Sequence, residues 1–382
     1  MNTPEIHALK ITRRIFLLCI FFSYFSLAHS AQATSCELTS KYGWNLNHDI
    51  PFVGSGLSTV GEDLSIGETI YSSTHAKTKG MYIYYECDDT DTAIVYSRVE
   101  AISTPYGAPI VSGDQAIYPT NVPGIGVTFE IETVNSLATT FPHTWEDSLY
   151  VSLNTIITLN PLKKIAFKLI KTGVINTIDT QQVLASSFPT FRITIGAKAP
   201  TADEKIASTI NFNGSMILHT KTCQISTPQI SVDLGTHDIA EFKKPGASTD
   251  WEYFDIRLIN CPPFYGYSNY KVSSTGKESG TITPNKVNFG FKSYYGTVQD
   301  NPRLANIEST PNSASGIGIE LSQKNESISI MLDGSSGFDL QNLNTDDNAT
   351  YIIPMKARYV QYDSHVKGGL ANGAVAFTVT YQ

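Results

Sequence analysis

Residues 368–382, GGLANGAVAFTVTYQ, end this sequence in a run of alternating large and small residues. In a β-strand, Val375, Phe377, Val379 and Tyr381 point to one face, and the alanines and threonines between them point to the other. The pattern predicts a strand with one face in a core. Because no turn or further strand follows it, and because an uncovered strand edge is an aggregation hazard, we expect another element to pair with this strand.

The rest of the chain has the sequence pattern of an all-β protein. Short segments rich in Val, Ile, Thr, Tyr and Phe recur between clusters of Gly, Pro, Asn and Ser, as in GVTFEIETV, STINFNGSMIL and YFDIRLINC. The segment PLKKIAFKLIKTG (161–173) fits a helical face as well as strand alternation. We predict a strand there, because its neighbours are strands and Gly173 ends it early.

The N-terminus predicts secretion. Arg13 and Arg14 precede an apolar run at 15–27 and a small-residue stretch, which together are typical of a signal peptide over residues 1–33. The run is short for a membrane span, which needs about 20 residues. The formal charge of the whole chain is -8 and that of the mature chain is about -10, so we expect no nucleic acid partner.

The length of the mature chain predicts two domains. About 349 residues are too many for one small core. The polar stretch APTADEK (199–205) is typical of a linker, so we place the first domain at 34–204 and the second at 205–382.

Four cysteines remain in the mature chain, Cys36, Cys87, Cys223 and Cys261. Four cysteines allow three connectivities. The simplest is one bridge per domain, Cys36 to Cys87 and Cys223 to Cys261, each closing a loop that contributes about 3 to 4 kcal/mol in the chain-entropy model. No CxxC or HxxxH spacing favours zinc instead.

The C-terminal residues resemble chaperone-usher fimbrial subunits. The resemblance rests on Gly369, the penultimate Tyr381, GSMILHTKTCQI leading into Cys223, ASGIGIEL (314–321) and YIIPMKARYVQ (351–361). It implies an immunoglobulin-like pilin domain that lacks its last strand. A donor strand would then close the groove lined by Val375, Phe377, Val379 and Tyr381, lent first by a periplasmic chaperone and later by an adjacent fimbrial subunit, a case of β-augmentation. The implied route runs through the periplasm and an outer-membrane usher to the cell surface.

About 190 mature residues precede Cys223, where a shaft subunit would have a short donor extension. The resemblance therefore implies that this subunit lies at the fimbrial tip. TSC near the mature N-terminus, DLSIGETIY followed by YYEC, and AIYPTNVPGIGVTFEI resemble the lectin domain of two-domain tip adhesins. The resemblance therefore implies two immunoglobulin-like β-sandwich domains, with a host or surface glycan as the ligand of the first.

The resemblance nominates loop residues for that glycan. Shallow sugar sites need polar acceptors and an aromatic wall. The loop after Cys87 supplies Asp88, Asp89 and Asp91, and the segment LIKTGVINTIDTQ (169–181) supplies Asn176 and Asp179. Lys171 and Gly173 stand where mannose binders have amides, so mannose is not the expected sugar. FPHTWEDS (141–148) adds Trp145, although a tryptophan in such a domain is often part of the core.

We expect no enzyme, cofactor or metal site. There is no GxSxG motif, no Cys/His pair and no HxH spacing, and adjacent loop carboxylates do not suggest a glycosidase. Three hypotheses follow: a tip adhesin that binds a glycan, a tip subunit whose first domain binds a protein or abiotic surface, and, as the weakest, a secreted two-domain β hydrolase.

Overall fold

The computed structural model describes residues 36–40, 45–77, 83–87, 92–133, 136–150, 162–176, 180–197 and 204–382. These residues form strands and two short 3-10 helices, η1 (Ala185–Ser187) and η2 (Ile239–Glu241). None of them belongs to a helix long and apolar enough to cross a membrane.

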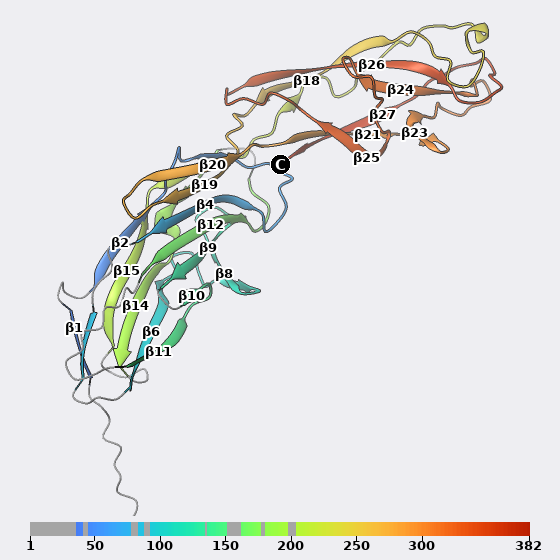
Figure 1. The fold of residues 1–382 in the computed structure, drawn as a ribbon. Coiled ribbons are helices and arrows are strands. Elements are labelled where there is room, and N and C mark those ends of the chain that lie inside the picture. The colour runs from blue at the N-terminus through green and yellow to red at the C-terminus, as the bar shows by residue number, and fades with distance from the viewer. Residues whose placement is uncertain are drawn as a thin grey trace, which may run out of the picture.

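Figure 1 shows two β-rich halves joined end to end in an elongated molecule. We call residues 36–222 the N-terminal half and residues 223–382 the C-terminal half. The all-β prediction is confirmed.

The largest sheet is built from both halves. Its central strand, β12, is the ambiguous segment of the sequence, and it is a strand with Ile165, Phe167 and Leu169 buried. Two strands at one edge, β19 and β20, come from the C-terminal half. In order the sheet contains β20 (Glu278–Thr283), β19 (Tyr267–Val272), β4 (Thr69–Ala76), β12 (Lys164–Lys171), β9 (Ile125–Glu132), β8 (Gln115–Pro119) and β7 (Ile110–Ser112), with β10 (Leu137–Ala138) beside β9.

A second sheet completes the sandwich of the N-terminal half. Its order is β11 (His143–Tyr150), β6 (Thr92–Ser103), β14 (Thr190–Ala197), β15 (Lys205–Asn213) and β2 (Leu46–Pro51). Two small sheets flank it: β13 (Gln181–Leu184), β16 (Ser215–His219) and β3 (Leu57–Thr59), and the pair β1 (Cys36–Ser40) and β5 (Ile83–Cys87).

Aromatic side chains fill the core between these sheets. Phe129 and Phe191 lie with ring centroids 4.9 Å apart, and Phe167 lies 5.6 Å from both Phe188 and Phe212. Full burial of one such side chain stabilises the fold by about 1.5 to 3 kcal/mol. The alternation of large apolar residues along β9, β12 and β14 therefore fixes the register of both sheets.

The C-terminal half has its own two sheets and its own core. One sheet contains β17 (Gln224–Ile225), β18 (Glu252–Cys261), β26 (Ala349–Gln361), β24 (Ile317–Gln323), β23 (Asn301–Ala305) and β22 (Thr297–Val298). The other contains β25 (Asp333–Asp339), β21 (Val287–Ser293) and β27 (Val375–Tyr381). Leu258, Phe289, Leu332 and Met355 are completely buried between them.

The disulfide of the C-terminal half is confirmed. Cys223 and Cys261 are bonded, and both lie in the C-terminal core. In the other half, the strand register places Cys36 opposite Cys87. Their side chains lie outside the described part of the structure, so this second bridge stays a prediction.

The packing bears on where the domains meet. Residues 205–219, which the sequence division assigns to the second domain, form β15 and β16 and pair with strands of the N-terminal half. Ala207, Ile210, Met216 and Leu218 belong to the N-terminal core. A polar stretch such as 199–205 does not reveal which core the next strand enters. We propose that the boundary lies between Thr220 and Cys223.

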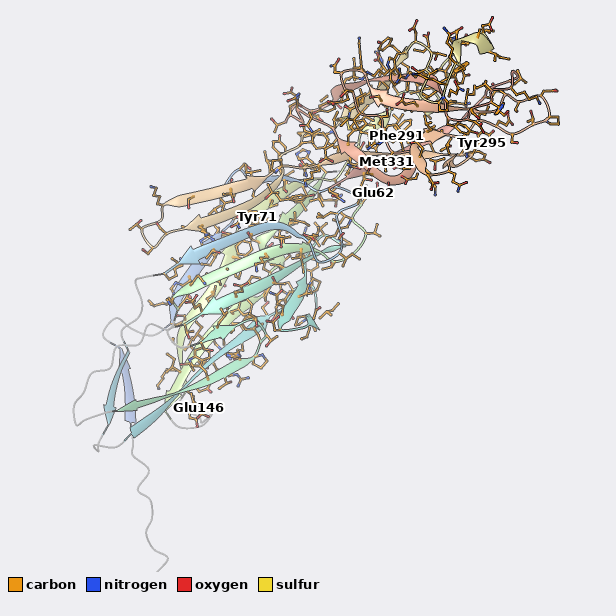
Figure 2. The ribbon with its side chains drawn as sticks, turned by 45° about the vertical axis from the view of Figure 1, so that its right-hand side comes forward. Glu62, Tyr71, Glu146, Phe291, Tyr295 and Met331 are labelled. Carbon is orange, nitrogen blue, oxygen red and sulfur yellow. A yellow bond between two sulfur atoms is a disulfide. The ribbon has the colours of Figure 1, made fainter. Side chains whose placement is uncertain are left out.

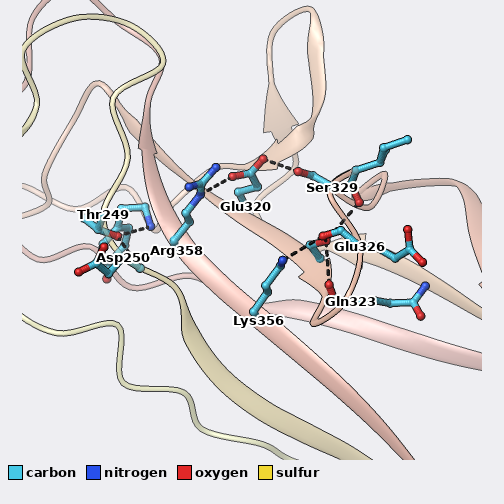
Figure 3. A network of polar contacts seen from close by, with 11 residues as sticks. Thr249, Asp250, Glu320, Gln323, Glu326, Ser329, Lys356 and Arg358 are labelled. Atoms are coloured by element: carbon cyan, nitrogen blue, oxygen red, sulfur yellow. Dashed lines mark hydrogen bonds and ion pairs between the residues drawn. The ribbon is translucent and has the colours of Figure 1, made fainter.

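The outer face of the larger C-terminal sheet carries a network of polar contacts (Figure 3). Arg358 Nε donates to Glu320 Oε2 at 2.7 Å, and Ser329 donates to the other oxygen of the same carboxylate. Lys356 Nζ donates to the carbonyl of Glu326 at 2.9 Å. Arg358 also lies 4.1 Å from the ring centroid of Trp251.

Candidate functional site

The last strand presents the face that its sequence predicts. Val375, Phe377 and Val379 are half-buried and pack against the C-terminal core, and Tyr381 is only 8% exposed. The ring of Phe377 lies 6.4 Å from that of Phe289 and 6.3 Å from that of Phe291. Three of the four predicted groove residues are therefore only partly covered by this chain.

One edge of β27 has no strand beside it. β27 pairs antiparallel with β21, from Val287 opposite Tyr381 to Ser293 opposite Val375, and it is the terminal strand of its sheet. No strand in the described part of the chain pairs with the other edge. The N–H and C=O groups along that edge form a template for a further strand.

A second segment of the C-terminal half alternates over the same core as β27 without being assigned to a strand. Residues 230–234 are assigned to no strand, yet Ile230, Val232 and Leu234 are half-buried while Ser231 and Asp233 between them are exposed. Ile230 and Leu234 pack on the same core as β27. This alternation is typical of a strand with one face on a core. We call Ile230, Val232, Leu234, Val375, Phe377 and Val379 the open face.

Two tyrosines connect the two segments of the open face. Tyr359 donates its hydroxyl to the carbonyl of Ala371 at 2.9 Å, and its ring lies 6.1 Å from that of His237, whose Nε2 is 2.7 Å from the carbonyl oxygen of Leu234. At the other end, Tyr381 forms a hydrogen bond with the backbone of Cys223. Burial, together with the nearby Asp63 carboxylate, raises the pKa of Tyr381 to about 12, although the hydrogen bond with Cys223 acts in the opposite direction. Tyr381 therefore stays neutral at physiological pH.

The predicted glycan residues are only partly described. Asp88, Asp89, Asp91 and Asp179 lie outside the described residues. Trp145 is on β11 opposite Ser97, and it is half-buried against the N-terminal core with its ring 5.8 Å from that of His143. The core contact fits the structural role that the sequence also allowed for this tryptophan.

Asn176 lies in a different part of the N-terminal half from Trp145. Its carbonyl accepts a hydrogen bond of 2.8 Å from Thr220, next to the junction of the two halves. Its neighbours Val174 and Ile175 line a pocket of about 350 Å³ together with Glu62 and Asp63. Figure 2 shows Glu62 at this junction and Glu146, the neighbour of Trp145, at the opposite end. The fold does not bring Asn176 and Trp145 into one site.

A second pocket of about 280 Å³ lies where the β19–β20 hairpin meets the N-terminal half. It is lined by His48, His75, Lys77 and the turn residues Ser273, Ser274 and Gly276, among others. His75 is 2% exposed and its Nε2 lies 2.8 Å from the Ser73 hydroxyl. Burial, followed by the charge of Lys77, lowers the pKa of His75 to about 4. Within the described ranges, no three His, Cys, Asp or Glu side chains are grouped as a metal site.

Two features at or beside the open face are absent from the sequence prediction. The segment ISVDL (230–234) alternates in the same way as the last strand, and this pattern could have marked it. Asp63, which contacts Tyr381 from the other half, has no sequence signal, because the contact joins residues more than three hundred positions apart.

Comparisons with known proteins agree with this architecture. A family model described as "Fimbrial protein" matches residues 210–382. A "Fimbria adhesin protein" of Klebsiella pneumoniae is 23% identical over 370 residues, covering 95% of this chain and 99% of the relative. A "Type-1 fimbrial protein subunit" of Serratia marcescens is 29% identical over 192 residues, covering 48% of this chain and 92% of the relative.

Among solved structures, the CupB6 tip adhesin of Pseudomonas aeruginosa aligns over 91% of this chain and 94% of its own. The sequence identity is 15% and the TM-score 0.33. By sequence, the chain is similar to the fimbrial protein family over residues 210–382 and to a fimbria adhesin over almost its full length.

Proposed function

We propose that this chain is a fimbrial tip adhesin whose C-terminal half accepts a donor strand and whose N-terminal half binds a surface glycan. The observation that supports the first part is the open face. Two segments, β27 with its one free edge and residues 230–234, which belong to no strand, alternate half-buried apolar and exposed residues over one core. A strand laid between them would satisfy the free edge of β27 and cover Val375, Phe377 and Val379.

The donor would come from two successive partners. A periplasmic chaperone would lend a strand after secretion, an outer-membrane usher would receive the complex, and an adjacent fimbrial subunit would then supply its own strand. In β-augmentation of this kind, main-chain hydrogen bonds give affinity and alternate side chains fill pockets. The subunit would thereby become a surface component of the fimbrium.

Donor-strand acceptance is tested with the mature chain, residues 34–382, with and without a donor segment fused to its C-terminus through a flexible linker. We expect the fused protein to be soluble and monomeric, and the unfused chain to aggregate unless the chaperone is co-expressed. The matched control is a donor whose inward-facing apolar residues are changed to Asp. Equal solubility of all three proteins would refute donor-strand acceptance.

Glycan binding rests on the family resemblance, and we assign it to loops of the N-terminal half. A glycan array with the donor-complemented chain tests it. Binding that is lost in Asp89→Ala or Asp179→Ala and kept in Asp114→Ala, a described residue on a separate turn, would support a glycan ligand. No binding across the array would favour the alternative, in which the N-terminal half binds a protein or an abiotic surface.

A further inference from the structure

Asp63 of the N-terminal half occupies the free edge of β27 at its last residue. Its backbone N–H donates to the carbonyl of Tyr381 at 3.2 Å, and its carboxylate Oδ2 accepts from the Tyr381 N–H at 2.9 Å. A residue of a neighbouring antiparallel strand makes the same pair of bonds, one given and one received. Asp63 therefore takes the place that a partner strand would have at Tyr381.

The hydrogen-bond pattern between β27 and β21 shows which backbone groups of β27 are left for a donor strand. The backbones of Gln382 and Lys286 exchange hydrogen bonds of 2.8 and 2.7 Å. The backbone N–H and C=O groups of the even-numbered residues of β27 therefore point toward β21. In an antiparallel strand, alternate residues direct their N–H and C=O groups to opposite edges. The groups of Val375, Phe377, Val379 and Tyr381 therefore face the free edge. With Tyr381 bonded to Asp63, three residues are left for a donor.

The loop that carries Asp63 is fixed from both halves. At its start, the Val60 N–H donates to the His219 carbonyl at 2.9 Å, and the Thr59 hydroxyl donates to the Pro263 carbonyl at 2.5 Å. The buried Lys171 donates through Nζ to the Glu62 carbonyl, directly before Asp63. These contacts hold the Asp63 backbone in line with the end of β27.

Gly61 brings this loop against the end of the strand. A Cβ atom at Gly61 would lie 2.1 Å from the Tyr381 carbonyl oxygen and 2.8 Å from the Gln382 nitrogen. A side chain therefore cannot be added without displacing the loop or the strand. The same closeness leaves no space for an additional strand alongside Tyr381 while the loop is in place.

We propose that the loop Gly61–Asp63 is a stop that ends the donor-strand site at Val379. The proposal rests on donor-strand acceptance and specifies its partner: a short extended segment that pairs with Val375, Phe377 and Val379 and gains nothing from residues placed beyond them toward Tyr381. The N-terminal half thus selects the length of the strand that the C-terminal half accepts.

The test uses the full mature chain purified with a weak short donor peptide that other peptides displace. Three competitors are compared: a donor that spans Val375–Val379, and the same donor lengthened by two residues at its N-terminal or its C-terminal end. One of the two extensions reaches toward Tyr381, whichever way the donor runs. For the wild-type chain, we expect that extension to leave the affinity unchanged.

In Asp63→Ala, the Tyr381 N–H loses its acceptor and the loop is held at Tyr381 by one hydrogen bond instead of two. The same extension should then tighten binding by about fivefold, the effect of one net backbone hydrogen bond. Asp63→Asn keeps a carbonyl oxygen as acceptor and should behave as wild type. Glu62→Ala removes a neighbouring exposed charge without removing a contact to Tyr381, so it is the matched control and should also behave as wild type.

Hydrogen exchange at the Tyr381 amide gives a readout that does not depend on donor length. We expect protection in the wild-type chain bound to the short donor and loss of protection in Asp63→Ala. Equal tightening by the extension in wild type and Asp63→Ala would overturn the stop while leaving donor acceptance intact. Failure of every donor to bind any variant would overturn both.

Discussion

Ser268 of the C-terminal half lies opposite Tyr71 of the N-terminal half in a parallel pair of strands. The pairing continues to Val272 opposite His75, so the hairpin β19–β20 extends the N-terminal sheet at its β4 edge. Buried hydrogen bonds of Ser58 to Gly266 and of Asn285 to Thr59 lie at the base of this hairpin. Each half therefore covers a strand edge of the other: the hairpin covers β4, and Asp63 covers the end of β27.

Removing the Tyr270 ring should destabilise the N-terminal half. Tyr270 packs on the N-terminal core, with its ring 6.3 Å from that of Tyr71. We expect Tyr270→Ala to lower the free energy of unfolding by about 2 to 3 kcal/mol, below the cost for a fully buried aromatic residue. Urea unfolding of the donor-complemented chain measures it. Tyr294→Ala, at a side chain 78% exposed, is the control and should change stability by less than about 0.5 kcal/mol.

Acid should weaken the region where the hairpin joins the N-terminal half. The folded pKa of His75 is about 4, below the ordinary value of 6.5, so the unfolded chain binds the proton first as pH falls. The contribution of neutral His75 is complete above about pH 6.5 and is lost as the pH approaches 4, by about 3 kcal/mol. His75→Gln should remove most of this pH dependence. His365→Gln, at an exposed histidine, should leave it unchanged.

The two faces of β27 should respond differently to substitution. Phe377 faces the core and the open face, whereas Ala376 is exposed and lies opposite Lys292. We expect Phe377→Ala to weaken donor-peptide binding by about tenfold, because the donor would cover the exposed part of a ring whose full burial is worth about 1.5 to 3 kcal/mol. Ala376→Ser should bind as wild type. Equal loss in both variants would argue against the open face as the binding surface.

The disulfide should support the donor site as well as the fold. Cys223 precedes residues 230–234, and the bridge to Cys261 closes a loop of 38 residues. Replacing both cysteines by Ala should lower stability by about 4 kcal/mol in the chain-entropy model. If the bridge also holds the segment that lines the open face, donor binding should weaken even under conditions where circular dichroism shows the chain still folded.

The sequence predicted which segments form strands and which face of each strand is buried, because both depend on residues that are close together in the chain. The alternation of Val375, Phe377, Val379 and Tyr381 gave the face of the last strand, and the period-2 pattern around Phe167 gave β12. The pairing of Cys223 with Cys261 followed from their spacing along the chain.

The junction of the halves could not be predicted in this way. The residues of β20 are all exposed, and nothing in their sequence indicates that their hairpin joins a sheet some two hundred residues away in the chain. The residues around Asp63 look like those of any polar turn, and only the tertiary fold brings Asp63 to Tyr381. Of the predicted glycan residues, Asn176 and Trp145 are described, and they lie at different ends of the N-terminal half. The predicted loop position of Trp145 is wrong, because this residue lies on strand β11.

The hairpin also determines how the molecule carries tension. β19 begins at the junction and runs alongside β4 into the N-terminal half (Figure 1). A pull that separates the halves along the length of the molecule acts along β19, so it loads the hydrogen bonds from Ser268 to Val272 in shear, all at the same time. Peeling them one by one would require a force across the strand. An adhesin anchored at one end and attached at the other would therefore be loaded in the direction in which the pairing of β19 with β4 resists force most strongly.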